Sequence, residues 1–190
     1  MNVQNRESIC VAVIGDAHLE LGSPKEKIAE IIGYGIIDAG YKLITGGLGG
    51  VMEASCRGAR KSPKWVNGSI IGLLPGTDPA EANPYVDVVI PTGLDHGRNL
   101  IIAQAGAIIA IGGGAGTLSE IALAWIYRRL IIALRCEGWS GRLADQRLDE
   151  RIRYPDIPED RVFGASTPEE ALRLLDSYVL RYNRRHHRIR

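Results

Sequence analysis

Glycine-rich segments that could hold a phosphate group follow several apolar runs of this 190-residue chain. Glycine lets the backbone approach an anion closely, and the free N–H groups at the start of a following helix point toward that anion. Two of the segments lead from an expected strand directly into an expected helix, which favours binding over a simple tight turn. We therefore expect a phosphate-bearing ligand to be bound by Gly15, Asp16, Gly46, Gly47, Gly49, Gly50, Pro75, Gly76, Gly112, Gly113, Gly114, Gly116 and Thr117.

Three polar side chains near the second of these segments could act on such a ligand. Arg98 precedes the segment, and its guanidinium can hold a phosphate bidentately. Asn99 follows Arg98 and, with Asp16, would hydrogen-bond the ligand. Glu120 follows the segment, and a carboxylate near a ribose can activate water or stabilise a cationic transition state. The sequence from Thr117 to Glu120 also has the spacing of a capping box in the first turn of a helix, so Glu120 is either a catalyst or a cap.

Several other site classes lack their signatures. The dinucleotide pattern G-x-G-x-x-G fails, because its sixth position is Met52 counted from Gly47 and Thr117 counted from Gly112. The chain contains no G-x-x-x-x-G-K-[ST] sequence, which disfavours a P-loop NTPase. We expect no metal site, because the histidines lack ligand companions, and no pyridoxal-phosphate Schiff base, because no lysine lies in a glycine-rich loop.

Short apolar runs alternate with amphipathic segments along the chain. Strands are expected at residues 9–14, 41–45, 69–74, 86–90, 107–111 and 130–134, and helices at 25–39, 51–61, 96–105, 117–127 and from 168 onward. Strands without polar alternation are buried on both faces, so the pattern predicts a Rossmann-like, doubly wound parallel α/β sheet with helices on both faces, forming one domain over residues 1–190. The segment 139–160 is expected to be a long loop or a small surface element. The helical segment 121–126 is apolar all round and is expected to be fully covered.

Charge and composition limit the partners. Residues 1–180 hold 18 basic and 22 acidic residues, which makes nucleic acid an improbable ligand. Residues 181–190 hold five arginines and no acid, and we expect them to form a solvated basic tail. Three widely spaced cysteines and the lack of a signal peptide or a membrane-length apolar stretch indicate a cytoplasmic protein that does not enter a membrane.

The order of these motifs resembles the LOG (Lonely Guy)-like, or SLOG, Rossmann superfamily, some members of which are labelled lysine decarboxylase-like. The motifs are Thr45-Gly46-Gly47-x-Gly49-Gly50-x-Met52, Gly72-x-x-Pro75-Gly76, Gly97-Arg98-Asn99 and Gly113-Gly114-x-Gly116-Thr117-x-x-Glu120. The resemblance implies that Arg98 and Glu120 are the catalytic pair of a phosphoribohydrolase, which splits nucleoside 5′-monophosphates into free base and ribose 5-phosphate. The hallmark proline is Gly112 here, and the usual arginine-lysine pair is Arg98-Asn99. Nothing in the sequence supports decarboxylation.

The segment 71–120 is more similar to the molybdenum-cofactor carrier branch of that superfamily. Leu74-Pro75-Gly76, a following Thr92-Gly93-Leu94 and the loop that begins at Gly112 recur there in this order. The resemblance implies a homodimeric or homotetrameric protein that binds a small phosphorylated molecule, the molybdenum cofactor or a nucleoside monophosphate, and needs no cofactor for catalysis. A phosphoribohydrolase and a nucleotide sensor are the alternatives.

Overall fold

Short apolar segments form the strands of a single sheet, as their composition predicts, in this computed structural model of residues 6–182. The strands are β1 (Cys10–Gly15), β2 (Lys42–Thr45), β3 (Ile70–Leu74), β4 (Val88–Pro91), β5 (Ala107–Ile111), β6 (Leu130–Leu134) and β7 (Phe163–Ala165). The helices are α1 (Pro24–Asp38), α2 (Val51–Arg60), α3 (Asn99–Ile102), α4 (Ala115–Ile126), α5 (Trp139–Leu143) and α6 (Pro168–Tyr178). Two short 3-10 helices are η2 (Pro79–Glu81) and η3 (Asp95–Arg98).

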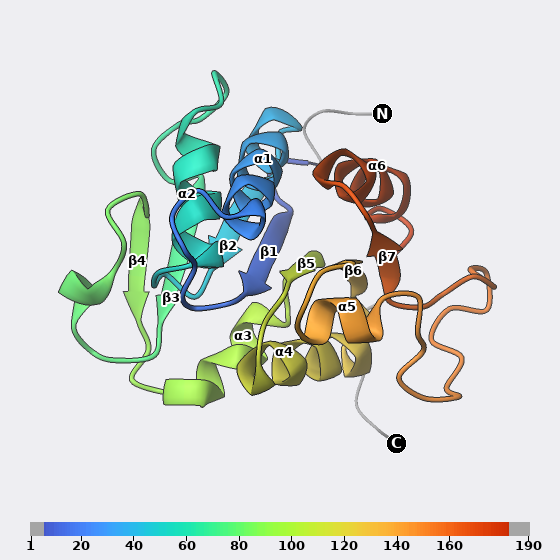
Figure 1. Ribbon diagram of the computed structural model, residues 1–190. Helices are drawn as coiled ribbons and strands as arrows, with labels where there is room; N and C mark the ends of the chain where they lie inside the picture. The colour runs from blue at the N-terminus through green and yellow to red at the C-terminus, as the bar shows by residue number, and fades with distance from the viewer. Residues whose placement is uncertain (1–5, 183–190) are drawn as a thin grey trace.

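The sheet is parallel throughout, with the strand order β4-β3-β2-β1-β5-β6-β7. Figure 1 shows α1, α2 and α6 on one face and α3, α4 and α5 on the other. The expected doubly wound α/β fold is therefore confirmed. The chain proceeds outward from β1 to β4, returns to the centre at β5, and then proceeds outward in the other direction.

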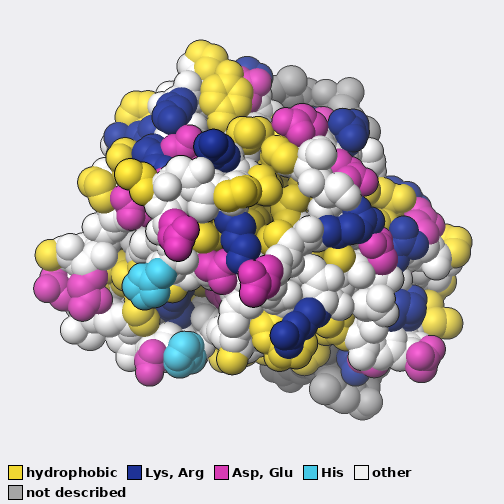
Figure 2. All heavy atoms as spheres, viewed as in Figure 1, with side chains coloured by type: hydrophobic (Ala, Val, Ile, Leu, Met, Phe, Trp, Pro, Cys, Tyr) yellow, Lys and Arg dark blue, Asp and Glu magenta, His cyan; other side chains and the backbone are white. Residues whose placement is uncertain are grey.

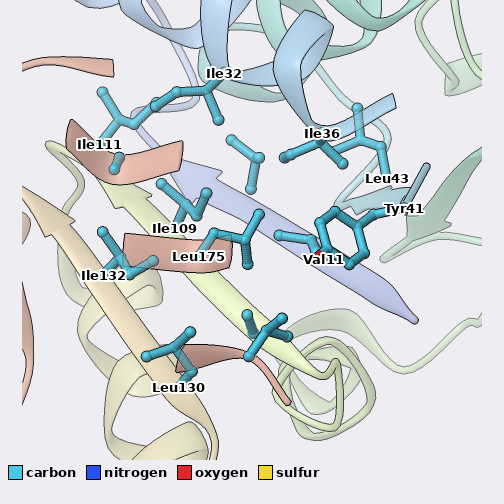
Figure 3. Packing of buried hydrophobic residues seen from close by; sticks show 14 of the residues in the cluster. Val11, Ile32, Ile36, Tyr41, Leu43, Ile109, Ile111, Leu130, Ile132 and Leu175 are labelled. Atoms are coloured by element: carbon cyan, nitrogen blue, oxygen red, sulfur yellow. The ribbon is translucent and has the colours of Figure 1, made fainter. Parts of the chain in front are cut away.

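Alternate residues of the central strands build two separate cores. In β1, Val11 and Val13 pack toward α1, α2 and α6, whereas Ala12 and Ile14 pack toward α3 and α4. Figure 3 shows the first of these cores, where side chains from α1 and α6 meet those of β1, β5 and β6. Because both faces are covered, the strands carry apolar residues at every position and not at every second one.

Side-chain caps fix the starts of the first and last helices. The hydroxyl of Ser23 accepts a hydrogen bond from the N–H of Glu26 at the start of α1, at 3.3 Å. The hydroxyl of Thr167 accepts one from the N–H of Glu170 at the start of α6, at 3.2 Å. Each cap satisfies an N–H that has no partner within its helix, and a proline follows each cap residue.

Some of the expected elements differ from those observed. The helix expected at 96–105 is only η3 followed by the four residues of α3. The segment 139–160 begins with α5, and the sequence analysis missed β7, because three residues around Gly164 are too few to show a periodic pattern. The prediction that 121–126 is fully covered is wrong, since Ile126 is 40% exposed at the end of α4.

A buried ion pair attaches the irregular segment after α5 to α4. Arg153 donates a hydrogen bond from Nε to the carboxylate of Asp160 at 2.9 Å, and its guanidinium lies 3.7 Å from the ring centroid of Trp125. The hydroxyl of Tyr182 donates to the same carboxylate at 2.6 Å. Tyr182 is thus part of the core, so the expected solvated tail cannot begin before it. The remainder of that expected tail, 183–190, lies outside the described residues.

Charged side chains of both signs are interspersed over the face that Figure 2 shows. Ion pairs within residues 6–182 include the pair of Arg57 with Glu30 and the pair of Arg135 with Asp145. No helix within residues 6–182 is long and apolar enough to cross a membrane.

Candidate functional site

The site lies where β1 and β5 run side by side and the chain leaves them toward opposite halves of the sheet. Gly15 is paired with Ile111, so the loops that follow the two strands begin next to each other. The N–H of Asp16 donates to the carbonyl of Ile111 across this junction, at 3.3 Å. Such a point at the carboxyl edge of a parallel sheet leaves a crevice, which is where open α/β folds bind ligands.

The turn at Gly112–Gly113 is held by hydrogen bonds within the protein. The N–H of Gly112 donates to the hydroxyl of Ser140 at 2.8 Å, and the N–H of Gly113 donates to Oδ1 of Asp16 at 2.9 Å. Both carbonyls of the turn accept from the first residues of α5, at 3.0 Å each. These two amides are therefore not free to bind an anion, and their expected direct role gives way to a supporting one.

Asp16 is the residue that connects this turn to the rest of the site. Its Oδ2 accepts from Nζ of Lys25 at 2.7 Å, and its own carbonyl accepts from the N–H of Val51 at 2.9 Å. The side chain thus has two partners inside the protein, although the sequence analysis expected it to contact the ligand. The missed partners are Lys25 and Ser140, which no motif marks because they come from distant segments.

Helix α4 presents free backbone donors to the crevice. The helix begins at Ala115, its N-cap Gly114 provides no side-chain cap, and the first backbone bond of the helix runs from the N–H of Leu118 to the carbonyl of Gly114. Within the described residues, the N–H groups of Ala115, Gly116 and Thr117 therefore have no hydrogen-bond acceptor. Donors of this kind, together with the positive end of the helix dipole, form a favourable position for an anion.

The capping-box interpretation of Glu120 is wrong. Because α4 starts at Ala115, Glu120 lies in the second turn and cannot cap the first. The hydroxyl of Thr117 instead donates to the carbonyl of Gly15 at 3.3 Å, which fastens the helix to β1. The helix was expected to start at Thr117, two residues too late, because Gly114 and Gly116 are poor helix formers.

Glu120 is a buried carboxylate facing the crevice. Its residue is only 7% exposed, and no hydrogen bond or ion pair reaches its side chain from the described part of the protein. Burial raises the pKa of Glu120 to about 7, and the positive charge of Arg98 opposes this rise. The carboxyl group is therefore shared between its protonated and ionised forms near neutral pH.

Arg98 also lines the crevice, at the end of η3. Its Nη1 donates to the carbonyl of Leu73 at 3.1 Å, so the end of β3 fixes its direction. Burial lowers the pKa of the guanidinium, against the charges of Glu120 and Asp95. The guanidinium lies so close to Gly46 that a side chain at that position would collide with it, which explains the glycine.

The first glycine-rich loop is attached to the segment before β4. The N–H of Gly47 donates to the hydroxyl of Thr45 at 3.0 Å, and the carbonyl of Gly47 accepts from the N–H of Asn83 at 2.8 Å. Nδ2 of Asn83 also donates to the carbonyl of Leu48 at 3.0 Å. This loop therefore shapes one wall of the crevice, and Asn83 is a support that the sequence analysis did not identify.

The crevice is a pocket of about 360 Å³, within the size range of small-molecule sites. Among the expected residues, those that line it are Gly15, Gly46, Pro75, Arg98, Asn99, Gly114, Gly116, Thr117 and Glu120. Those that do not line it are Asp16, Gly47, Gly49, Gly50, Gly76, Gly112 and Gly113. The lining residues that were not expected are Val13, Ile14, Ala17, Leu48, Met52, Asp95 and His96. Their apolar members form an apolar wall of the pocket. Met52 belongs to the first motif, and the only sequence signal of the other six is proximity to a strand end or to Arg98.

Asn99, the first residue of α3, is hydrogen-bonded to α4 beside the pocket. Its Nδ2 donates to the hydroxyl of Ser119 at 2.8 Å, and that hydroxyl donates to the carbonyl of Gly116 at 2.7 Å.

In residues 6–182, no group of three or more histidine, cysteine, aspartate or glutamate side chains is arranged to hold a metal ion.

Comparison with protein families agrees with this geometry. Residues 8–172 match the model of the SLOG cluster4 family. The chain belongs to that family. An uncharacterized protein of Archaeoglobus fulgidus is 41% identical to this SLOG cluster4 protein over 115 residues, which are 60% of this chain and 72% of the relative. The expected superfamily is thereby confirmed.

Two similar solved structures are proteins that handle the molybdenum cofactor. The molybdenum cofactor binding protein of Rippkaea orientalis is 32% identical, with a TM-score of 0.72 over 90% of this chain and 97% of its own. The molybdenum cofactor carrier protein of Chlamydomonas reinhardtii is 25% identical, with a TM-score of 0.71 over 90% of this chain and 98% of its own. This SLOG cluster4 protein thus resembles molybdenum cofactor carrier proteins over nearly the whole fold.

Proposed function

We propose that the protein binds a phosphate-bearing, nucleotide-like ligand in this pocket. The observation that carries the proposal is the free N-terminus of α4, where Gly114 leaves the helix uncapped toward the pocket. A phosphate would accept hydrogen bonds from the N–H groups of Ala115, Gly116 and Thr117, and the guanidinium of Arg98 would balance its charge. The organic part of the ligand would lie against the apolar wall.

The molybdenum cofactor and a nucleoside monophosphate are the two ligands that we propose. Similar solved structures bind or carry the molybdenum cofactor, which favours it as cargo. The lining supports both ligands, because the uncapped start of α4 offers donors to an anion and the apolar wall offers a surface to a ring. The homodimer or homotetramer expected from the resemblance stays a prediction, and size-exclusion chromatography of the purified chain tests it.

A single position in α4 tests the anion site. No atom lies near the Cβ that a side chain at Gly116 would add, so substitution there leaves the fold intact. Gly116→Asp places a negative charge among the free N–H groups and should weaken binding of AMP, measured by calorimetry, roughly tenfold or more. Gly116→Asn is the matched control, with the same size and no charge. Equal affinities of the two variants for AMP would contradict the proposed anion position.

Phosphoribohydrolase activity is the second candidate, and Glu120 supports it. A buried carboxyl group with a pKa of about 7 suits a general acid or base, and Arg98 lines the same pocket. The enzyme would release adenine from AMP, which chromatography detects, and Glu120→Gln would abolish the release while binding continued. If purified protein binds AMP without releasing adenine, it is a binding or carrier protein.

A further inference from the structure

Glu120 is the one acid that lines the pocket on α4, and within residues 6–182 its carboxylate has no hydrogen bond or ion pair, although the charge of Arg98 acts on it. Burying a carboxylate is costly, and a ligand that supplies N–H or O–H donors lowers the cost. Glu120 lines the pocket and belongs to neither of the two cores. It is therefore free to recognise a ligand group, and its burial makes that recognition selective.

The position of Glu120 on α4 limits what its carboxylate can contact. Glu120 lies four residues after Gly116 and lines the same pocket, so its side chain lies over the turn that carries the free N–H groups. Carboxylate and phosphate oxygens are both acceptors and like charges repel, so the phosphate cannot be the partner of Glu120. The group that meets Glu120 therefore belongs to the organic part of the ligand, which the apolar wall formed by Ile14, Leu48 and Met52 suits as a flat ring.

We propose that Glu120 reads the edge of the ligand ring and selects rings that carry a ring N–H beside an exocyclic amino group, as in guanine and pterins, over adenine. A carboxylate has two oxygen acceptors, and such an edge offers two parallel donors that match them. Adenine offers one donor beside an acceptor at its corresponding edge, so a carboxylate oxygen would face a lone pair. This inference rests on the proposed ligand-binding function.

The selection should depend on pH. The other titratable side chains that line the pocket are Asp95, His96 and Arg98. Pairing with two donors favours the ionised form of Glu120, whose pKa is about 7 in the free protein. The ratio of GMP affinity to AMP affinity should therefore rise about tenfold between pH 6 and pH 8. The two nucleotides carry the same phosphate, so titration of the phosphate cancels in the ratio.

Calorimetry with GMP, AMP, IMP and ribose 5-phosphate tests the proposal. IMP keeps the ring N–H and lacks the amino group, and ribose 5-phosphate tests the anion site alone. We expect GMP to bind roughly tenfold or more tighter than AMP at pH 8, with IMP between them. In Glu120→Gln the preference for GMP over AMP and its pH dependence should disappear, because an amide group has only one acceptor oxygen. The control Glu150→Gln, at an exposed position, should retain both.

The outcomes separate this inference from the proposed function. Equal binding of GMP and AMP, weakened equally by Glu120→Gln, would show that Glu120 contacts the sugar hydroxyls and would overturn the proposal. Equal affinities for GMP and AMP that Glu120→Gln leaves unchanged would also overturn the inference. Binding of ribose 5-phosphate in that case would still support the proposed anion site. Binding of none of the four probes would overturn the inference together with the proposed function.

Discussion

Replacing Glu120 with glutamine should stabilise the ligand-free protein at neutral and alkaline pH. Burial raises the pKa of this carboxyl from its ordinary value of 4.5 to about 7. At about 1.36 kcal/mol for each pH unit, keeping Glu120 ionised in the folded state costs on the order of 3 kcal/mol. The carboxyl group of Glu120 loses its proton more easily in the unfolded chain than in the folded protein. Its ionisation therefore lowers the free energy of unfolding as pH rises from about 4.5 to about 7, and the loss is constant above pH 7.

Thermal unfolding of the wild type and of Glu120→Gln from pH 5 to pH 8.5 measures this effect. For a chain of this size, the variant should gain roughly 6–12 °C in melting temperature relative to the wild type between the two ends of the range. Comparison of the two proteins at each pH removes the contribution of all other titrating groups, and Glu150→Gln provides a control on an exposed carboxylate. A difference that stays constant with pH would refute the reasoning, because it would mean that Glu120 ionises as readily in the folded protein as in the unfolded chain.

Three further predictions concern the turn beside the site and the buried ion pair of Arg153 with Asp160, and urea unfolding measures them. Asp16→Ala removes the acceptor from the Gly112–Gly113 turn and should cost about 1–3 kcal/mol, and ligand affinity should fall with it. Gly138→Ala should destabilise the protein by about 1–3 kcal/mol, because Gly138 has φ 118° and an added Cβ would lie 2.6 Å from the backbone of the Gly112–Gly113 turn. An unchanged free energy of unfolding would mean that the turn can move. Asp160→Asn leaves Arg153 buried without its counter-charge and should cost about 3–5 kcal/mol, and a loss below 1 kcal/mol would contradict a buried pair.

The alternation of apolar runs and amphipathic segments was enough to predict the parallel sheet. Strands buried on both faces must be apolar at every position, so β5 and β6 are predictable with their correct ends. The helices expected from 25 and from 168 begin within one residue of α1 and α6, because the caps Ser23 and Thr167 fix these starts by local hydrogen bonds between residues three apart. The three residues of β7 were not predictable, since their strand pairing depends on β6 and not on their own pattern.

The site divides in the same way. Sequence alone determined the glycine-rich loops, the placement of Arg98 and Glu120 beside them, and the superfamily, because these depend on residue type, local spacing and the carboxyl edge of a parallel sheet. Only the tertiary structure decided which amides are free. The amides of the Gly112–Gly113 turn are occupied by Asp16 and Ser140, which are remote in the sequence. The role of Glu120 depended likewise on where α4 begins and on the packing that buries it, and both are set by contacts between segments that no local pattern records.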